Sequence, residues 1–521
     1  METSNSKRLI CDVDEFPERK GQAIVLAIQH ILAMFVACIT VPLIVFSGYT
    51  LADGTPLTSA MIPPTLVAAA VGTAFYLVMT KFKSPMFLAS SFAYLAPMCA
   101  AVATGAVTTA TGAHLANLWM LPIGMAMVGI VYVIVALLIA KFGVKWLNHL
   151  LPPIVIGPVI MVIGLSLAGS AVNNLTGTAS GDYNLIKILC GLCALMITGI
   201  TARWGKGFIS IIPFVMGMVG GYVIAAIFTA IGYHACGNEY FKVIDWAPIV
   251  NNFVNADGSF RGIQAFIDIP KFLFLAEVNG DAAPFDWAQL GQAAALFIPV
   301  SLVTICEHIG DHKNMSNIID RDLLTEPGLS RTLIGDGVAT ALSGVICGAA
   351  NTTYGENVAV VGVTKIASTK VILLACAMTF LLAFISPIMA FTTTIPACIT
   401  GGVSLILYGF IANSGIRMLI NSKVDMSKNA NIFIASTILV AGIGGLVLDF
   451  GGITITSTAV AMILGIIMNG ALYDRDRGGE TDMLGNEIPS KEEKYLETKE
   501  PEAEPVIEEQ KIEEPVAEQA E

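Results

Sequence analysis

Long apolar runs separated by short polar connections dominate the chain. Runs long enough to cross a hydrocarbon core of about 30 Å as helices lie near residues 22–46, 57–79, 118–140, 151–170, 184–202, 208–231, 290–319, 331–349, 371–394, 401–420, 430–448 and 455–473. Two shorter apolar runs, near 85–100 and 352–364, are interrupted by Gly, Pro and polar residues. The pattern predicts an all-α polytopic membrane protein with fourteen transmembrane segments.

The second short run contains an acid at membrane depth. Glu356 lies within Asn351–Lys365, between two long apolar runs, and an ionised carboxylate there costs about 2.5–3.5 kcal/mol. Residues 351–354 favour an extended strand, Gly355 permits a sharp backbone change, and residues 357–363 are apolar enough for a short helix. This order predicts a discontinuous segment, a short strand followed by a half-helix, which must line a cavity or a binding site.

Positive charges fall in alternate connections. They are Lys7, Arg8, Arg19, Lys20, Lys81, Lys83, Lys141, Lys145, Arg203, Lys206, Lys313, Arg321, Lys365, Lys370, Arg417, Lys423, Lys428, Arg475 and Arg477. Short connections rich in Lys and Arg remain in the cytoplasm. We therefore expect a multi-pass protein of the inner (plasma) membrane with both termini cytoplasmic and residues 232–289 as an external loop.

The two halves of the chain resemble each other. Residues Pro152, Gly157, Val159, Ala168 and Ser170 match Pro396, Gly401, Val403, Ala412 and Ser414 at the same spacings. In the same order, 29–31 resembles 307–309 and 90–93 resembles 352–355. Seven segments per repeat is an odd number, so the second repeat must be inverted, as in many secondary transporters. The two short segments are third in each half, so segments 3 and 10 are both expected to be discontinuous.

Composition supports a membrane protein and excludes a nucleic-acid partner. Charged residues are 13% of the chain, against about 25% in soluble domains. The net charge is −12, and residues 474–521 hold about −11 of it, so the remainder is almost neutral and unsuited to binding nucleic acid. We expect 474–521 to be a disordered acidic cytoplasmic tail.

Cys190 and Cys193 lie inside an apolar helix and have a structural role, and no metal or cofactor is predicted.

One apolar run carries a cluster of titratable groups. On a helix, Thr304, Glu307 or His308, and Asp311 recur on one face, which should point to a cavity. Apart from Glu356, we place only Glu307 well inside a span. Because no nucleophile–base pair and no HExxH-type metal motif is present, we expect a transporter and not an enzyme.

Two buried carboxylates suit either a cation or a flat heterocycle with ring N–H groups. Carboxylates accept from ring N–H groups, and backbone N–H groups at the start of a half-helix donate to ring carbonyls. Such backbone is available after Gly355 and near Phe92, while Phe92, Tyr94 or Tyr354 can cover a ring face. Gln29 and His30 are expected to support the site through hydrogen bonds. Glu307, His308 and Asp311 are the candidates for proton coupling.

At this point the motifs resemble a known family, the nucleobase-ascorbate transporters, in the bacterial uracil permease form. The similar stretches are Asn351-Thr-Thr-Tyr-Gly-Glu-Asn, Glu307-His-Ile-Gly, Ala89-Ser-Ser-Phe-Ala-Tyr-Leu-Ala-Pro and Gln29-His-Ile-Leu-Ala-Met-Phe. The resemblance covers about residues 20–473. It implies a two-repeat transporter that imports a nucleobase with protons by alternating access.

The resemblance also implies roles for residues. Glu307 and Glu356 would bind the N–H groups of the base. Gly355 and Phe92 would contribute backbone contacts, and Tyr354 would lie beside the base. Asn357 is placed with them among the substrate-binding residues.

Two positions depart from the uracil permease pattern. Asp311 stands where these permeases usually have His, as in purine-type relatives, and Ala359 stands where the motif usually has Gly. Glu356, in contrast, resembles the uracil type. Uracil is therefore the expected substrate and xanthine the alternative, with an anion transporter on the same scaffold as a third reading.

The resemblance divides the chain into a core that moves against a gate. The expected divisions are 1–20 as a cytoplasmic N-terminal segment, 21–150 and 290–394 as core, 151–231 and 395–473 as gate, 232–289 as external loop and 474–521 as tail. The expected partners are uracil or a related nucleobase, protons and the lipid bilayer. Members often dimerise through the gate, so a homodimer through this domain is a further expectation.

Overall fold

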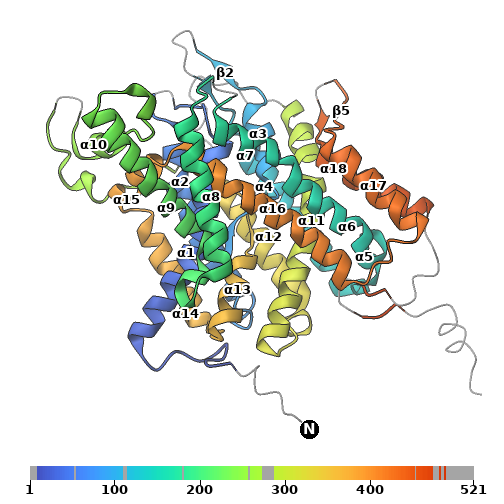
Figure 1. Ribbon diagram of the computed structural model, residues 1–521. Helices are drawn as coiled ribbons and strands as arrows, with labels where there is room; N and C mark the ends of the chain where they lie inside the picture. Colours follow the sequence, from blue (N-terminus) through green and yellow to red (C-terminus); the bar gives the residue numbers. More distant parts are fainter. Residues whose placement is uncertain are drawn as a thin grey trace, which may run out of the picture.

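The structure is a computed structural model that describes residues 9–51, 54–109, 114–178, 181–255, 258–272, 287–451, 453–472, 480–482 and 486–488. Helices make up almost all of its regular structure (Figure 1). Within these ranges, 8 helices are long and apolar enough to cross a membrane. The main helices are α1 (Lys20–Val45), α2 (Leu57–Met79), α4 (Met120–Phe142), α6 (Pro153–Ser166), α7 (Ala168–Thr176), α8 (Leu185–Trp204), α9 (Pro213–Phe228), α11 (Trp287–Ile319), α12 (Leu329–Val345), α14 (Thr369–Leu382), α15 (Ser386–Thr393), α16 (Ala397–Asn421), α17 (Asn429–Ile443) and α18 (Ser457–Ala471).

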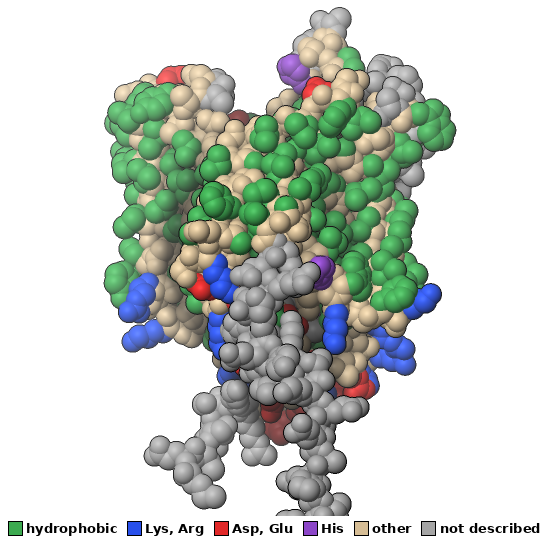
Figure 2. All heavy atoms as spheres, turned by 90° about the vertical axis from the view of Figure 1, so that its right-hand side faces the viewer, with side chains coloured by type: hydrophobic (Ala, Val, Ile, Leu, Met, Phe, Trp, Pro, Cys, Tyr) green, Lys and Arg blue, Asp and Glu red, His purple; other side chains and the backbone are tan. Residues whose placement is uncertain are grey.

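The outer surface matches the expected membrane environment. Figure 2 shows hydrophobic side chains over the flank of the molecule, while Lys and Arg gather at one end. On α4, for example, Ile130, Ile134 and Leu137 are exposed. Apolar side chains on the outside of a helix bundle are stable when lipid covers them, so this flank is the surface that faces the bilayer.

The two short segments form the centre of the molecule. Strand β1 (Leu88–Ser90) leads into helix α3 (Leu95–Ala103), and strand β4 (Asn351–Thr353) leads into helix α13 (Gly355–Thr364). The strands pair antiparallel, with Leu88 opposite Thr353 and Ser90 opposite Asn351. The predicted strand-plus-half-helix is therefore confirmed for both segments. Because the strands are antiparallel, the two half-helices begin near each other and run in opposite directions.

The remaining helices pack as two groups. Helix α12 packs against α4 and α2, α11 packs against α4, and α1 packs against α2 and α14. In the other group, α16 packs against α6, α7 and α8, α8 packs against α9, and α17 packs against α18 and α6. Each group combines helices from both halves of the chain, which brings the two discontinuous segments together inside the first group.

Small residues set the close approach of α16 to α8. A Cβ at Gly402 would lie 2.0 Å from the Gly191 carbonyl oxygen, whereas a Cβ at Gly409, on the same helix, has no heavy atom within 4 Å. We expect Gly402→Ala to destabilise the protein by about 1–3 kcal/mol, because the backbones must move apart. Gly409→Ala is the matched control and should be neutral or slightly stabilising. Thermal unfolding of the two variants in detergent checks this, and equal midpoints would contradict it.

Two predicted spans differ from the structure. The run 371–394 is divided into α14 and α15, because Ile385 pairs with Ile267 of the long connection between α9 and α11 and Asp268 N–H donates to the Phe384 carbonyl at 3.0 Å. This connection thus provides hydrogen bonds where the helix ends. The run 430–448 ends as a helix at Ile443, and the chain continues into the two-stranded sheet of β5 (Leu448–Asp449) and β6 (Thr454–Ile455).

Six residues of the predicted tail, 480–482 and 486–488, are described and contact the body of the protein. Glu480 and Thr481 are buried, and Thr481 forms an antiparallel bridge with Glu487. Specific hydrogen bonds to the body of the protein hold these residues, and composition does not reveal such contacts. The rest of 474–521 lies outside the described residues.

Candidate functional site

The site is built around the start of helix α13. Gly355, its first residue, is exposed. Apart from its chain neighbours and its own helix backbone, the one described heavy atom within 4 Å of a Cβ built there is Asp311 Oδ1, at 3.5 Å. Tyr354 N–H donates to the Phe87 carbonyl at 3.2 Å, and Ser91 N–H donates to the Ala350 carbonyl at 2.8 Å, which extends the strand pairing on both sides. The positive end of a helix dipole therefore faces open space beside rigid backbone.

Helix α11 adds two carboxylates to this space. Glu307 and Asp311 are one turn apart and both are partly exposed, as is Glu356 in the first turn of α13. Asp311 Oδ2 accepts a hydrogen bond from Thr353 Oγ1 at 2.8 Å. Glu307 interacts electrostatically with Asp311 and Glu356. The structure therefore brings together the three acids that the sequence singled out, and like charges this close favour an occupant that supplies N–H donors or protons.

Helix α1 brings Gln29 and His30 to the other side of α13. Both side chains are buried, and His30 lies next to Asn357. Within the part of the chain that the structure describes, Gln29 Oε1, His30 Nδ1 and both polar atoms of the Asn357 amide are buried without a protein hydrogen-bond partner. Buried polar atoms nearly always have a partner, so these groups have hydrogen-bonding capacity left for a polar occupant.

The aromatic residues have different positions. Phe92 is buried in the turn between β1 and α3, and its ring packs edge-on against Tyr408 of α16, 6.2 Å between centroids. Tyr354 is buried just before α13. Tyr94, which we considered as a cover for a ring, instead hydrogen-bonds Thr304 Oγ1 at 2.8 Å and stacks on Phe297. Phe92 thus joins the two helix groups, whereas Tyr94 packs α3 against α11.

The interpretation of Glu307 as the sole further acid well inside a span is wrong. Asp336 lies in the middle of α12, fully buried, and its Oδ2 accepts a hydrogen bond from His308 Nδ1 at 2.8 Å. His308 therefore points to α12, away from the face that carries Glu307. Glycines on both sides of Asp336 were the signal in the sequence: a Cβ at Gly337 would lie 2.3 Å from Tyr132 Cβ, so α12 is buried on this side too.

A second buried histidine adjoins this pair. The rings of His312 and His308 stack with 4.0 Å between centroids. His312 Nδ1 donates to the His308 carbonyl at 2.8 Å, so its Nε2 accepts from the Tyr76 hydroxyl at 2.6 Å when the ring is neutral. Ser84 is also within hydrogen-bond distance of the Tyr76 hydroxyl, 2.8 Å. A polar network that sequence periodicity did not predict therefore lies behind the acids.

None of these groups is arranged for metal binding. In the described part of the chain, no group of three or more His, Cys, Asp or Glu residues could hold a metal ion.

Crossed strands between half-helices, with acids at their junction, define a membrane transporter built on inverted repeats. Solved structures have this fold: the transmembrane domain of a cyanobacterium bicarbonate transporter, BicA, is 16% identical with a TM-score of 0.52, over 84% of this chain and 97% of that one. The structure of SLC26A9 is 11% identical with a TM-score of 0.54, over 86% of this chain and 65% of that one. The predicted arrangement of two inverted seven-segment repeats is confirmed; fourteen crossings stays a prediction.

The sequence comparisons identify the family. The Permease family, which is that of the xanthine and uracil permeases, matches this chain over residues 21–450. The uracil permease of Bacillus caldolyticus is 35% identical over 472 residues, which are 90% of this chain and 96% of that protein. The uracil permeases of Bacillus subtilis and Escherichia coli K12 are 34% and 32% identical, over 85% of this chain in each case and over 91% and 90% of those proteins. The chain belongs to this family, the nucleobase-ascorbate transporters.

Proposed function

We propose that this protein imports uracil together with protons by alternating access. The observation that carries the proposal is the position of Glu356 in the first turn of α13, close to Glu307 of α11 and beside the exposed Gly355. Relatives at 32–35% identity that are named uracil permeases support the substrate.

The chemistry of uracil fits these groups. Its two ring N–H groups donate to the carboxylates of Glu307 and Glu356, and each charge-assisted hydrogen bond contributes about 1.5–3 kcal/mol. Its carbonyls accept from backbone N–H groups at the start of the half-helices, near Gly355 and Phe92. Phe92 and Tyr354 border the ring, while Asn357 completes the polar wall.

Protons enter the proposal through groups that share the same space. Glu307 and Asp311 are partly exposed there, so a proton taken up with the substrate can reduce the repulsion among the acids. His308, the residue after Glu307, forms a fully buried hydrogen bond with Asp336. In the proposal this pair is the second group that holds a proton. Gln29 and His30 support the site from the side of α1, where His30 lies next to Asn357.

We also propose the architecture in which these groups act. Fourteen segments form a core, 21–150 and 290–394, and a gate, 151–231 and 395–473, with the site at their boundary. Both termini lie on the cytoplasmic side of the inner membrane, residues 232–289 lie outside, and a homodimer forms through the gate. The contact of Phe92 with Tyr408, which joins the two helix groups, supports a substrate site at this boundary.

A xanthine symporter is the second candidate. Asp311, which replaces the His usual in uracil permeases, favours it, because a carboxylate adds an acceptor for the further N–H groups of a purine. An anion transporter, as the fold of the bicarbonate transporter suggests, is disfavoured by the same acids, which repel an anion.

Uptake of radiolabelled uracil into proteoliposomes tests the proposal. The measurement is made with and without an inward proton gradient, and with excess unlabelled xanthine as competitor. The expected result is uracil uptake that requires the proton gradient and is not inhibited by excess xanthine. Uptake blocked by xanthine would favour the purine reading, and gradient-independent ohmic current without nucleobase would favour an anion pathway.

A further inference from the structure

The described part of the acidic tail folds as a short hairpin against the end of the molecule where Lys and Arg gather. We call residues 480–482 and 486–488 the tail hairpin. Ile488 N–H donates to the Glu480 carbonyl at 2.8 Å, and Asp482 N–H donates to the Asn486 carbonyl at 2.9 Å. Asn486 N–H in turn donates to Asp482 Oδ1 at 2.8 Å. Backbone and side chain both hold the two strands together, so this segment is a folded element.

The tail hairpin is anchored on the connection between α16 and α17. Glu480 is buried, with its carboxylate 3.3 Å from Asn431 Nδ2 and 3.9 Å from Lys428 Nζ. Thr481 N–H donates to the Ser422 carbonyl at 2.9 Å. A buried carboxylate without donors would be costly, so these contacts specify where the hairpin docks.

An ion pair strengthens this anchor at the surface. Lys423 Nζ lies 2.8 Å from Glu487 Oε1, and both groups are exposed. The Lys423 hydrogen bond and charge lower the pKa of Glu487 below its ordinary value of 4.5. The pair therefore contributes fully above pH 4.5 and is lost only as the pH falls through the lowered pKa. Changes of pH near neutrality do not release it.

The tail hairpin also binds helix α5 (Lys145–Leu150), which connects α4 to α6. Asn148 Nδ2 donates to Asp482 Oδ2 at 3.1 Å. On its other side, α5 is held by Asn469 of α18, whose Nδ2 donates to the His149 carbonyl at 3.5 Å. Helix α5 lies in one of the connections between the first helix group and the second, so it must yield when one group moves against the other.

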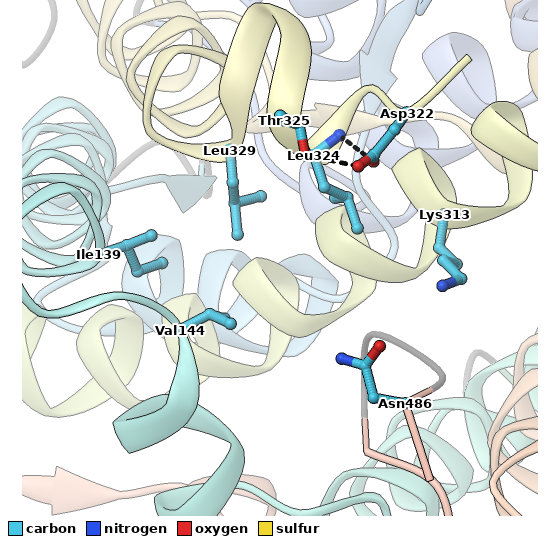
Figure 3. Close-up of a pocket in the computed structure, with 8 residues that line it drawn as sticks. All are labelled: Ile139, Val144, Lys313, Asp322, Leu324, Thr325, Leu329 and Asn486. Carbon is cyan, nitrogen blue, oxygen red and sulfur yellow. Dashed lines mark hydrogen bonds between the residues drawn. The ribbon is translucent and has the colours of Figure 1, made fainter. Parts of the chain in front are cut away.

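The tail hairpin finally faces the first helix group across a pocket. Asn486 lines a pocket of about 370 Å³ with Lys313 of α11, Leu329 of α12 and the connection between these helices. Figure 3 shows Asn486 on one side of this space and Asp322, Leu324 and Thr325 on the opposite side. The hairpin thus stands on one helix group and borders the space that separates it from the other.

We propose that the tail hairpin is an intrachain latch that restrains the movement of the core against the gate. It rests on the proposed function, because it presumes that uptake requires this movement. The surface formed by residues 421–431 and Asn148 is the docking site, and the chain's own acidic tail is its partner. The anchors are few, and the exposed Lys423–Glu487 ion pair adds little on its own, so the latch opens and closes reversibly.

Two shortened chains test the latch. A chain that ends at residue 479 lacks the hairpin, whereas a chain that ends at residue 490 keeps it and loses most of the remaining acidic tail. We expect the first to take up uracil about three- to tenfold faster than the full chain, and the second to stay within about twofold. Equal uptake by all three chains would overturn the latch.

A cross-link separates docking from uptake. Asn148→Cys and Asp482→Cys together should be bridged by a short, reducible bis-thiosulfonate, with Asn148→Cys alone as control. Bridging should slow uptake at least about threefold, and a reductant should restore it. Absence of bridging would overturn docking, and bridging with unchanged uptake would overturn the restraint. Bridging needs no substrate, so these results are distinct from a loss of uracil uptake in every variant, which would count against the proposed function.

Discussion

Glu356→Gln should reduce uracil binding at least about a hundredfold while the protein still folds and inserts. The carboxylate is the only negative group in the first turn of α13, and Gln replaces one acceptor oxygen by an NH₂ group that faces the ring N–H of uracil. Loss of a charge-assisted hydrogen bond costs about 1.5–3 kcal/mol, and the opposed donors add a desolvation cost. Equilibrium binding of labelled uracil to purified protein measures the effect.

A surface substitution of the same kind provides the control. Glu239 lies exposed in the short helix Glu239–Phe241, in the connection between α9 and α11, so Glu239→Gln should leave uracil binding unchanged. Normal affinity in Glu356→Gln would remove this residue from the site. An equal loss in both variants would mean that the assay reports protein quality and not recognition.

Asp336→Asn should uncouple uptake from the proton gradient. Asn cannot carry the negative charge that holds a proton on His308, although it can still accept the hydrogen bond from His308 Nδ1, which spans 2.8 Å in the native protein. We expect gradient-driven accumulation of uracil to fall about tenfold or more. Uracil affinity should change less than about threefold, because Glu307 and Glu356 remain.

The comparison of two assays makes this prediction specific. Exchange of internal for external uracil, which requires no net proton movement, should persist in Asp336→Asn when net accumulation is lost. Asp322→Asn, in the exposed connection after α11, is the control and should behave like the native protein. Full accumulation by Asp336→Asn would exclude Asp336 from coupling.

Sequence reasoning could predict the centre of the site because its signals are local. A carboxylate directly after Gly355, and a polar strand before it, require a broken segment wherever they occur in a membrane. The spacing of Glu307 and Asp311 places them on one helical face in any α-helix. The equivalent segment at Phe92 followed from the repeat, and the pairing of β1 with β4 connects them.

What could not be predicted depends on neighbours far away in the chain. His308 appeared to share the face of Glu307, but its partner Asp336 lies on α12, and nothing in the local pattern identifies that helix as the neighbour. Tyr94 was a candidate to cover the ring of the substrate, but in the structure it hydrogen-bonds Thr304 and stacks on Phe297. Composition correctly identified an acidic tail, yet the docking of Glu480 depends on Asn431 and Lys428, which only the folded chain brings close.

The most direct test of the central claim is an experimental structure of the protein with uracil bound in a bilayer mimetic. We predict that the ring lies between the starts of α3 and α13, with its N–H groups about 2.7–2.9 Å from carboxylate oxygens of Glu307 and Glu356. Uracil bound elsewhere, or bound here without contact to either carboxylate, would contradict the account.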